Sequence, residues 1–402
     1  MISIQNYYGI VDDEVIHKLY NVSKKLFNKR MVHINSTFVG GGVAEMLSTF
    51  IPLMNDIGVE AEWRIQYGVP DFFAITKEFH NALQGDNITL SEHKRRAYLL
   101  ANERFSTFTR LHHDLIIIHD PQPLPLINYY IKKQPWIWRC HIDLSHPNKE
   151  LWAYLKKFII KYDMVIVSNE KYIQDDLPIQ FKIINPAISP LSTKNMELSD
   201  KEIEGVLQKY KIPTDKKIIT QISRFDKWKD PEGVIELFKI VKQKCKDCRL
   251  VLCGSMATDD PEGIEIYKRV QKKASSLIES GDIILITVEN NFLVNALQRA
   301  SAVIIQKSIK EGFGLTVTEA LWKGAAVVAS RVGGIPLQIT DGVSGYLLDP
   351  QDVDGFAERI IYLLQNESKA KEFGIAGKEH VRKNFLMTRL LLDYMNLMND
   401  IF

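Results

Sequence analysis

Short apolar runs alternate with longer amphipathic stretches along almost the whole chain. Such runs, each bounded by turn or helical residues, are typical of buried parallel strands. The pattern predicts strands at 31–35, 61–67, 115–120, 136–141 and 164–168 in the first half, and at 217–222, 249–253, 283–286, 302–305 and 325–329 in the second. Helices are expected between them, for example over 44–53 and 231–244. This alternation indicates doubly wound α/β domains.

A break in the pattern over 185–192 contains Pro186, Pro190 and several turn residues. A chain of 402 residues is too long for one ordinary core, so we predict two domains. The first spans 1–190 and the second 191–385, followed by a final helix over 386–402. Residues 12–27 read as an amphipathic helix that packs on the first domain. Alternatively, this helix forms a dimer contact, in which case the protein is a homodimer.

Composition narrows the class of protein. Hydrophobic residues make up 46% and charged residues 25%, and 51 basic against 49 acidic residues give a net charge of +2. This balance argues against a nucleic-acid binder or a polybasic membrane protein. Neither a signal peptide nor a membrane span is read, so a cytoplasmic protein is expected. Cys245 and Cys248 form one isolated CxxC, for which a chance spacing is favoured over a redox or metal role.

The most informative segment runs from Glu311 to Glu319. Gly312, Phe313, Gly314, Leu315 and Thr316 read as a glycine turn that opens a helix, and the free amides and dipole of a helix start suit a phosphate. Glu319 is expected two helical turns after Glu311, so that the two carboxylates share nearly one helix face. The segment therefore predicts a site for a phosphate, a sugar and a ribose, as an enzyme using an activated sugar requires.

Further candidates follow other predicted strands. Gly40, Gly41 and Gly42 follow the first strand and would let the backbone approach a phosphate or sugar closely. Arg224 and Lys229 flank the turn after the strand at 217–222, where two cations can neutralise a diphosphate. Alone, that loop would read as a solvated charged loop.

His141 ends the strand predicted over 136–141, close to Arg139 and Asp143, and a role as a sugar ligand is weighed evenly against a satisfied core histidine. The other histidines, His119 among them, lack metal-ligand spacing. The glycines at 333–334 and the turn over 341–346 are read as structural.

These residues resemble the GT4 family of retaining glycosyltransferases with the GT-B fold. The resemblance rests on Ser223-Arg224 with Lys229, on the block from Glu311 to Ala320, and on the segments 324–330, 333–334 and 341–342. The first half is most similar to trehalose glycosyltransferring synthases and trehalose phosphorylases, through 33–37, 40–45 and 138–143. Ser223 stands where the family often has glycine, and Ala326 where it often has proline.

The resemblance implies two Rossmann-like domains facing across a cleft, with the C-terminal helix crossing back to the first. It implies that Glu319 binds the ribose, Arg224 and Lys229 the diphosphate, and Glu311 and His141 the donor glucose. The implied distal-phosphate ligands are the amides near Gly314, Leu315 and Thr316, with Gly41 and Gly42 close to the leaving phosphate. The base is expected near Thr287 and Val288.

The implied reaction transfers glucose from a nucleoside diphosphate glucose, such as UDP- or ADP-glucose, to free glucose, giving α,α-trehalose. The alternatives are a trehalose phosphorylase using glucose 1-phosphate, another GT4 enzyme with a different acceptor, and a non-catalytic sensor. No obligate metal is expected, with Mg²⁺ at most accompanying the nucleotide sugar in solution.

Overall fold

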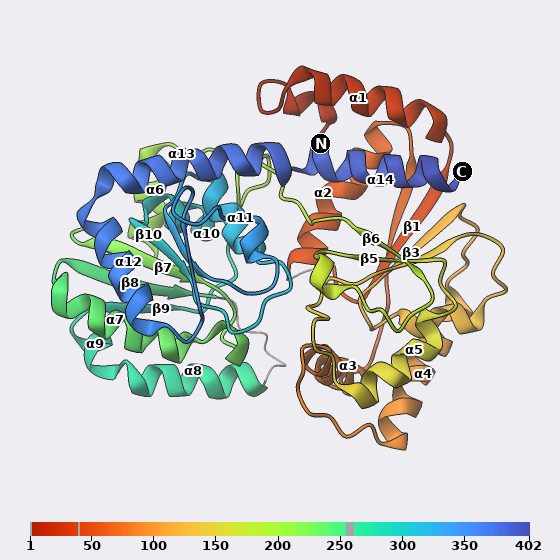
Figure 1. Ribbon diagram of the computed structural model, residues 1–402, viewed down its shortest axis with the longest axis horizontal. Helices are drawn as coiled ribbons and strands as arrows, with labels where there is room; N and C mark the ends of the chain where they lie inside the picture. Colours follow the sequence, from red (N-terminus) through yellow and green to blue (C-terminus); the bar gives the residue numbers. More distant parts are fainter. Residues whose placement is uncertain (1, 39–40, 255–260) are drawn as a thin grey trace. The chain divides into compact units, whose positions relative to one another are not determined.

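The computed structural model describes residues 2–38, 41–254 and 261–402. The chain divides into two compact units, each built around one parallel β-sheet (Figure 1). The first unit comprises the chain up to Ala187 together with Phe385–Phe402, and the second unit comprises Ile188–Asn384. The C-terminal helix α14 therefore belongs to the first unit, although it follows the second unit in sequence.

The sheet of the first unit has the strand order β2-β1-β3-β4-β5-β6 among the described residues, and all its pairings are parallel. Neighbouring strands with crossover helices place every carboxyl end at one edge, where ligands bind in such sheets. The strands are β1 Arg30–Asn35, β2 Glu60–Ile65, β3 Leu115–His119, β4 Trp136–Arg139, β5 Met164–Val167 and β6 Gln180–Ile183. The helices are α1 Asp13–Ser23, α2 Gly42–Asp56, α3 Pro70–Leu83, α4 Glu92–Phe108, α5 Lys149–Ile159 and α14 Met387–Ile401.

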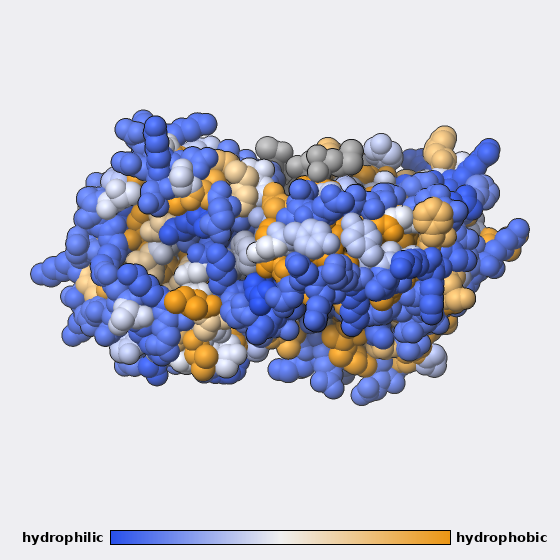
Figure 2. Space-filling view, turned by 90° about the horizontal axis from the view of Figure 1, so that it is seen from above, coloured by the Kyte–Doolittle hydropathy of each residue, from blue (hydrophilic) through white to orange (hydrophobic). Residues whose placement is uncertain are grey.

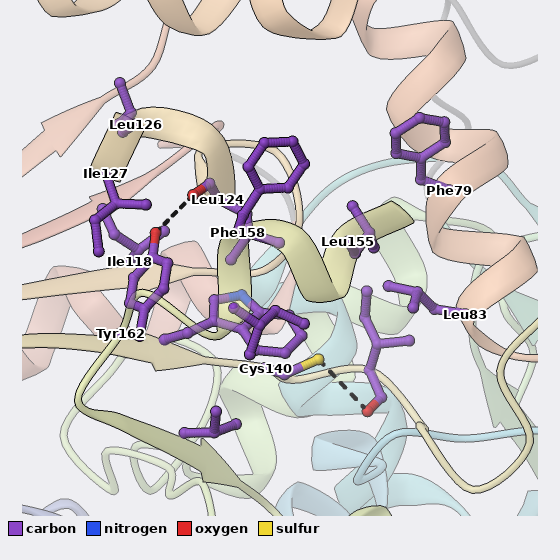
Figure 3. Packing of buried hydrophobic residues seen from close by; sticks show 14 of the residues in the cluster. Phe79, Leu83, Ile118, Leu124, Leu126, Ile127, Cys140, Leu155, Phe158 and Tyr162 are labelled. Carbon is purple, nitrogen blue, oxygen red and sulfur yellow. Dashed lines mark hydrogen bonds between the residues drawn. The ribbon is translucent and has the colours of Figure 1, made fainter. Parts of the chain in front are cut away.

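Alternate residues of these strands face two different helical layers. Helices α3, α4 and α5 cover one face of the sheet, and α1, α2 and α14 lie on the other (Figure 1). Figure 3 shows the first layer, where Phe79 of α3 and Phe158 of α5 belong to the same buried cluster as Ile118. The Tyr162 hydroxyl donates to the carbonyl of Leu124 at 2.7 Å, so this buried hydroxyl has a hydrogen-bond acceptor.

The sheet of the second unit has the order β12-β11-β10-β7-β8-β9 within the described ranges, again with parallel pairings. Helices α7, α8 and α12 pack on one face, and α6 and α10 on the other. The strands are β7 Lys217–Ile222, β8 Cys248–Cys253, β9 Ile283–Ile286, β10 Val303–Gln306, β11 Val327–Ser330 and β12 Tyr346–Leu348. The helices are α6 Asp200–Lys209, α7 Pro231–Lys244, α8 Pro261–Lys273, α9 Ser275–Glu279, α10 Asn291–Ala300, α11 Leu315–Trp322, α12 Val353–Gln365 and α13 Glu367–Asn384.

The predicted strands are confirmed, with shifts of one or two residues at most ends. The strand expected over 136–141 ends at Arg139, which leaves His141 in the following loop. Strand β6 was not predicted, because it is a half-exposed edge strand without a continuous apolar run. The helix expected over 12–27 ends at Ser23 and continues as a 3-10 turn, Lys24–Leu26.

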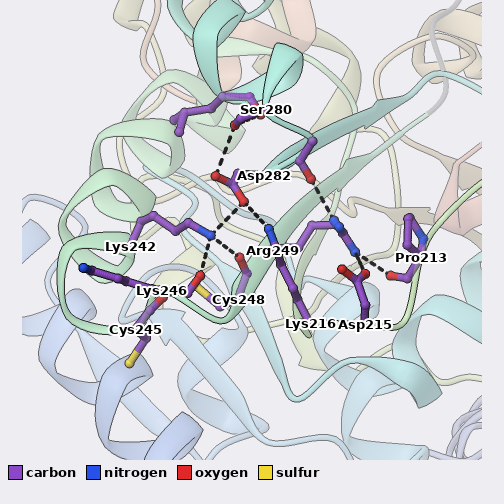
Figure 4. A network of polar contacts seen from close by, with 12 residues as sticks. Pro213, Asp215, Lys216, Lys242, Cys245, Lys246, Cys248, Arg249, Ser280 and Asp282 are labelled. Atoms are coloured by element: carbon purple, nitrogen blue, oxygen red, sulfur yellow. Dashed lines mark hydrogen bonds and ion pairs between the residues drawn. The ribbon is translucent and has the colours of Figure 1, made fainter.

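A polar network lies at the amino ends of β7, β8 and β9, away from the strand ends that carry the candidate site (Figure 4). Asp282 accepts hydrogen bonds from Lys216 at 2.8 Å and from Lys242 at 2.7 Å. The isolated CxxC borders this network: Cys245 and Cys248 are free thiols, and burial raises the pKa of Cys248 to about 11. This environment favours an unreactive, structural role for the Cys248 thiol.

The face of the molecule seen in Figure 2 is predominantly hydrophilic, with hydrophobic side chains in small separate groups. None of the helices in the described ranges is both long enough and apolar enough to cross a membrane.

Candidate active site

The loop after β10 leads directly into helix α11 of the second unit. Gly314 is the N-cap of α11, and its φ of 85° lies in the left-handed region that favours glycine. The helix begins at Leu315, so Glu311 lies in the loop and Glu319 in the helix. The prediction that both carboxylates share one helix face is therefore wrong. The predicted helix start with amides at Gly314, Leu315 and Thr316 is present.

The turn before α11 is held by hydrogen bonds to its carbonyls. Gln338 donates through Nε2 to the carbonyl of Phe313 at 2.5 Å, and the amide of Gly334 donates to the carbonyl of Gly312 at 3.2 Å. A Cβ at Gly334 would lie 2.9 Å from Cα of Phe313. The sequence explained Gly334 by a sharp turn alone. The structure adds a second reason, because Gly334 packs closely against the turn before α11.

Lys229 and Glu311 form the centre of the candidate site. Their Nζ and Oε2 atoms are 2.5 Å apart, and the side chains are only 16% and 12% exposed. Lys229 ends the 3-10 helix Lys227–Lys229, whose N-cap Asp226 accepts from the Lys229 amide at 3.1 Å. Arg224, by contrast, is 58% exposed and pairs with Asp226 at 3.3 Å. The structure thus brings one predicted cation together with one predicted carboxylate, and leaves Arg224 at the surface.

Two residues that the sequence reading missed join the loops after β7 and β10. Gln221 donates to the carbonyl of Lys229 at 2.9 Å and accepts from the amide of Lys307 at 3.0 Å. Lys307 is almost completely buried and forms an ion pair with Asp230, which caps α7 by accepting from Gly233. Asp230 has a φ of 46°, an unusual conformation for a residue other than glycine. The loop that carries Lys229 is therefore fixed from both sides.

Glu319 is buried in α11 and pairs with Lys194, whose Nζ lies 3.2 Å from Oε1. Lys194 precedes α6 and was not selected from the sequence, because 124 residues separate the two partners. Lys323, one turn after Glu319, donates to Asn195 and Gln298 at 2.8 Å each. The candidate ribose ligand thus has a charged partner and a firmly held helix.

Gly254 directly follows β8 and packs closely against the backbone that follows the neighbouring strand β7. A Cβ at this position would lie 1.8 Å from the carbonyl oxygen of Ser223, the residue before Arg224. A glycine at a strand end was the available sequence signal, but the contact joins loops of different strands. Gly254 therefore sets the position of the Ser223–Arg224 backbone.

We expect Gly254→Ala to displace that backbone and lower kcat/KM by about 10²-fold, since misplacing a site by about 1 Å can have this effect. Gly205→Ala is the matched control, because a Cβ there meets open space on α6. Steady-state kinetics at matched folded concentration checks the prediction. Equal activity of both variants would show that the Ser223 position is unimportant.

The remaining predicted ligands are placed separately. Gly41 precedes α2 with a φ of 83°, and Gly42 is the first residue of that helix, whereas Gly40 lies outside the described residues. Among the described residues, no atom beyond the chain neighbours lies within 4 Å of a Cβ built at Gly41. Val288 follows β9 and is 43% exposed.

His141 lies after β4 in the first unit, within a buried polar group. Its amide donates to Asp120 at 2.8 Å, and burial raises the pKa of Asp120 to about 6. Burial and the charge of Arg139 hold the pKa of His141 well below its ordinary value. His141 is also hydrogen-bonded to His119, which in turn contacts His33. The sequence identified His141 alone, because the three histidines come from three separate segments of the chain.

In the part of the chain that the structure describes, histidine, cysteine and carboxylate side chains form no cluster that could hold a metal ion. The candidate site offers instead Lys229, Arg224 and the first amides of α11 as partners for negative charge. These groups have the charge that a diphosphate requires.

The chain matches known proteins over nearly its whole length. Residues 33–174 match the model of the trehalose synthase N-terminal domain, and residues 203–380 match that of glycosyl transferases group 1. The chain is 45% identical to the trehalose synthase of Thermococcus litoralis over 99% of its own length and 97% of that protein. It is 29% identical to the trehalose phosphorylase of Pleurotus pulmonarius over 86% of its length, which is 54% of that protein.

Among solved structures, the α,α-trehalose-phosphate synthase (UDP-forming) of Burkholderia xenovorans, in complex with glucose 6-phosphate, has a TM-score of 0.75 at 13% identity. This match covers 93% of the present chain and all of the other. The fold and the two family models define a hexosyltransferase of the GT-B class. Within that class, the chain belongs to the trehalose synthase family.

Proposed function

We propose that this protein is a retaining glucosyltransferase that makes α,α-trehalose from a nucleoside diphosphate glucose and glucose, reversibly. The observation that carries the proposal is the partly buried pair Lys229–Glu311, placed beside the start of α11 and followed by the buried Glu319. In this arrangement Glu311 can accept hydrogen bonds from sugar hydroxyls, Lys229 can bind a phosphate, and Glu319 can bind a ribose. Similarity to trehalose synthases over nearly the whole chain supports the choice of glucose as acceptor.

In the absence of substrate, Lys229 and Glu311 neutralise each other. When the donor binds, Lys229 turns to the phosphate and Glu311 accepts hydrogen bonds from glucose hydroxyls. The amides at the start of α11 cap the distal phosphate, and Arg224, which is exposed at the surface, completes the clamp. Such preorganised donors stabilise the charge that develops on the leaving diphosphate.

Retention follows from substitution on one face of the sugar. The bond from the anomeric carbon to the diphosphate oxygen breaks through an oxocarbenium-like state. The oxygen of the acceptor hydroxyl then bonds to the same face, and its proton passes to the leaving phosphate. This route needs no carboxylate nucleophile, and we assign Glu311 and Glu319 to binding. It also needs no resident metal, since cationic side chains carry out the neutralisation.

We propose UDP- or ADP-glucose as the donor, with the base beside the backbone near Val288, which is exposed at the end of β9. A trehalose phosphorylase would use the same phosphate groups for inorganic phosphate. The resemblance to phosphorylases is lower and covers half of their length. Glu319 separates the two reactions, because a phosphorylase substrate has no ribose.

The proposal is tested with Glu319→Gln, which keeps the shape of the side chain and removes its charge. We expect KM for the nucleotide donor to rise about 10- to 100-fold, because hydrogen bonds to a charged group contribute about 1.5–3 kcal/mol. Glu197→Gln, an exposed carboxylate paired with Arg299, is the control and should leave KM unchanged. Initial rates with nucleotide glucose plus glucose, and with glucose 1-phosphate plus glucose, are measured in parallel. A silent Glu319→Gln together with turnover of glucose 1-phosphate would favour the phosphorylase.

A further inference from the structure

Three histidines form a hydrogen-bonded chain across the carboxyl edge of the first unit's sheet. Nδ1 of His33 lies 2.8 Å from Nε2 of His119, and Nδ1 of His119 lies 2.9 Å from Nε2 of His141. The residues come from β1, the end of β3 and the loop after β4, which are adjacent in the sheet. The rings of His119 and His141 stack with an interplanar angle of 11°. His33 and His119 are completely buried, and only His141 is partly exposed.

The three imidazoles are neutral near pH 7. Burial lowers the pKa of His33 to about 3, and burial followed by the neighbouring histidines and Arg139 lowers the pKa of His119. A neutral imidazole carries one N–H and one acceptor nitrogen. The two hydrogen bonds must therefore run in the same direction along the chain, either from His33 to His141 or the reverse.

The buried end of the chain selects the direction. Nε2 of His33 has no hydrogen-bond partner among the described residues. If the bonds ran from His141 toward His33, this nitrogen would carry a buried N–H without an acceptor, which is rarer in proteins than an acceptor that lacks a donor. The opposite direction places the proton on Nδ1 of all three rings. It leaves Nδ1–H of His141 for a partner outside the chain of histidines.

We propose that His33 and His119 are positioning residues that hold His141 as its Nδ1–H tautomer. His141 then presents a hydrogen-bond donor to a hydroxyl oxygen of the hexose, a role that rests on the proposed function. The tautomer itself is a property of the protein without substrate. A donor at this position binds a hydroxyl oxygen while leaving the hydroxyl proton for another acceptor.

The direct test is ¹⁵N NMR of the full-length protein with ¹⁵N-labelled histidine at pH 7.5, since protonated and unprotonated imidazole nitrogens resonate far apart. His141→Gln assigns the signals. We expect Nδ1 of His141 to be protonated and Nε2 unprotonated. In His33→Leu, which cannot donate to His119, the His141 signals should move toward a mixture of tautomers. In His33→Asn, whose amide can donate from a similar position, they should stay as in the parent protein.

Glucosyl transfer gives the second readout. We expect kcat/KM to fall about tenfold in His33→Leu and to recover in His33→Asn. Val32→Ala is the control for packing, because the buried side chain of Val32 belongs to the hydrophobic cluster on the face of β1 opposite to the His33 side chain. It should lose stability while its His141 signals and its activity per folded molecule stay unchanged.

Protonation of His141 at Nε2 in the parent protein would overturn the proposal. An unchanged His141 tautomer in His33→Leu would also overturn it. If His33→Leu does not fold, the spectra of the parent and of His33→Asn still decide the direction of the chain. If no nucleotide glucose is turned over, the proposed function fails, while the NMR measurement still decides the tautomer.

Discussion

Lys229→Ala is expected to lower kcat by about 10² to 10³, equivalent to about 3 kcal/mol of lost transition-state stabilisation. Lys229 is a partly buried cation paired with Glu311, which lies in the loop before α11. Its charge acts most strongly on the diphosphate as the sugar leaves, so the loss falls mainly on kcat. Steady-state kinetics with saturating donor and acceptor measures the effect.

The matched control is Lys227→Ala in the same 3-10 helix. Lys227 is exposed and lies over the Trp228 ring at 4.8 Å. It should keep near-normal turnover, and thermal unfolding should show that both variants are folded. Near-normal turnover of Lys229→Ala would remove this lysine from the mechanism.

Lys307→Met is expected to lower the free energy of unfolding by about 3 kcal/mol or more. Removing one partner of a buried ion pair leaves the other charge uncompensated, and Lys307 is the buried partner of Asp230. The substitution also releases the loop that carries Lys229. Chemical denaturation with turnover measured on the same samples checks both consequences.

The double variant Lys307→Met/Asp230→Asn separates lost charge from lost packing. Asparagine can still cap α7 as Asp230 does toward Gly233, and no uncompensated charge remains. The double variant should therefore recover most of the stability lost in Lys307→Met. Lys310→Met, a less buried lysine in the same loop, should be nearly silent. A Lys307→Met protein as stable as Lys310→Met would contradict the role given to the pair.

Much of the fold could be predicted because its central strands are fully buried and appear as unbroken apolar runs, such as β3 and β10. Strand β6 escaped prediction because its edge position exposes half of its residues, and Lys182 interrupts the apolar pattern. The final helix was predicted from its pattern, and the structure places it in the first unit.

The part of the candidate site that could be predicted is the part formed by residues close together in the sequence. Glu311, Gly314 and the start of α11 are contiguous, and their spacing indicated a phosphate site directly. Contacts between distant segments were not predictable from spacing, as with Lys194 and Glu319. Lys307 was missed for a related reason. At the end of an apolar strand a lysine reads as solvated, and only the fold brings Asp230 to it.

The central claim is that glucose moves from a nucleotide to glucose with retention. The most direct test incubates the protein with UDP-, ADP- or GDP-glucose and [1-¹³C]glucose, with a chelator and without added phosphate, and examines the product by NMR. The predicted result is a 1,1-linked disaccharide with α configuration at both anomeric carbons. Failure of every nucleotide glucose to give a disaccharide, a β configuration at the donor carbon, or a product that forms only from glucose 1-phosphate would contradict it.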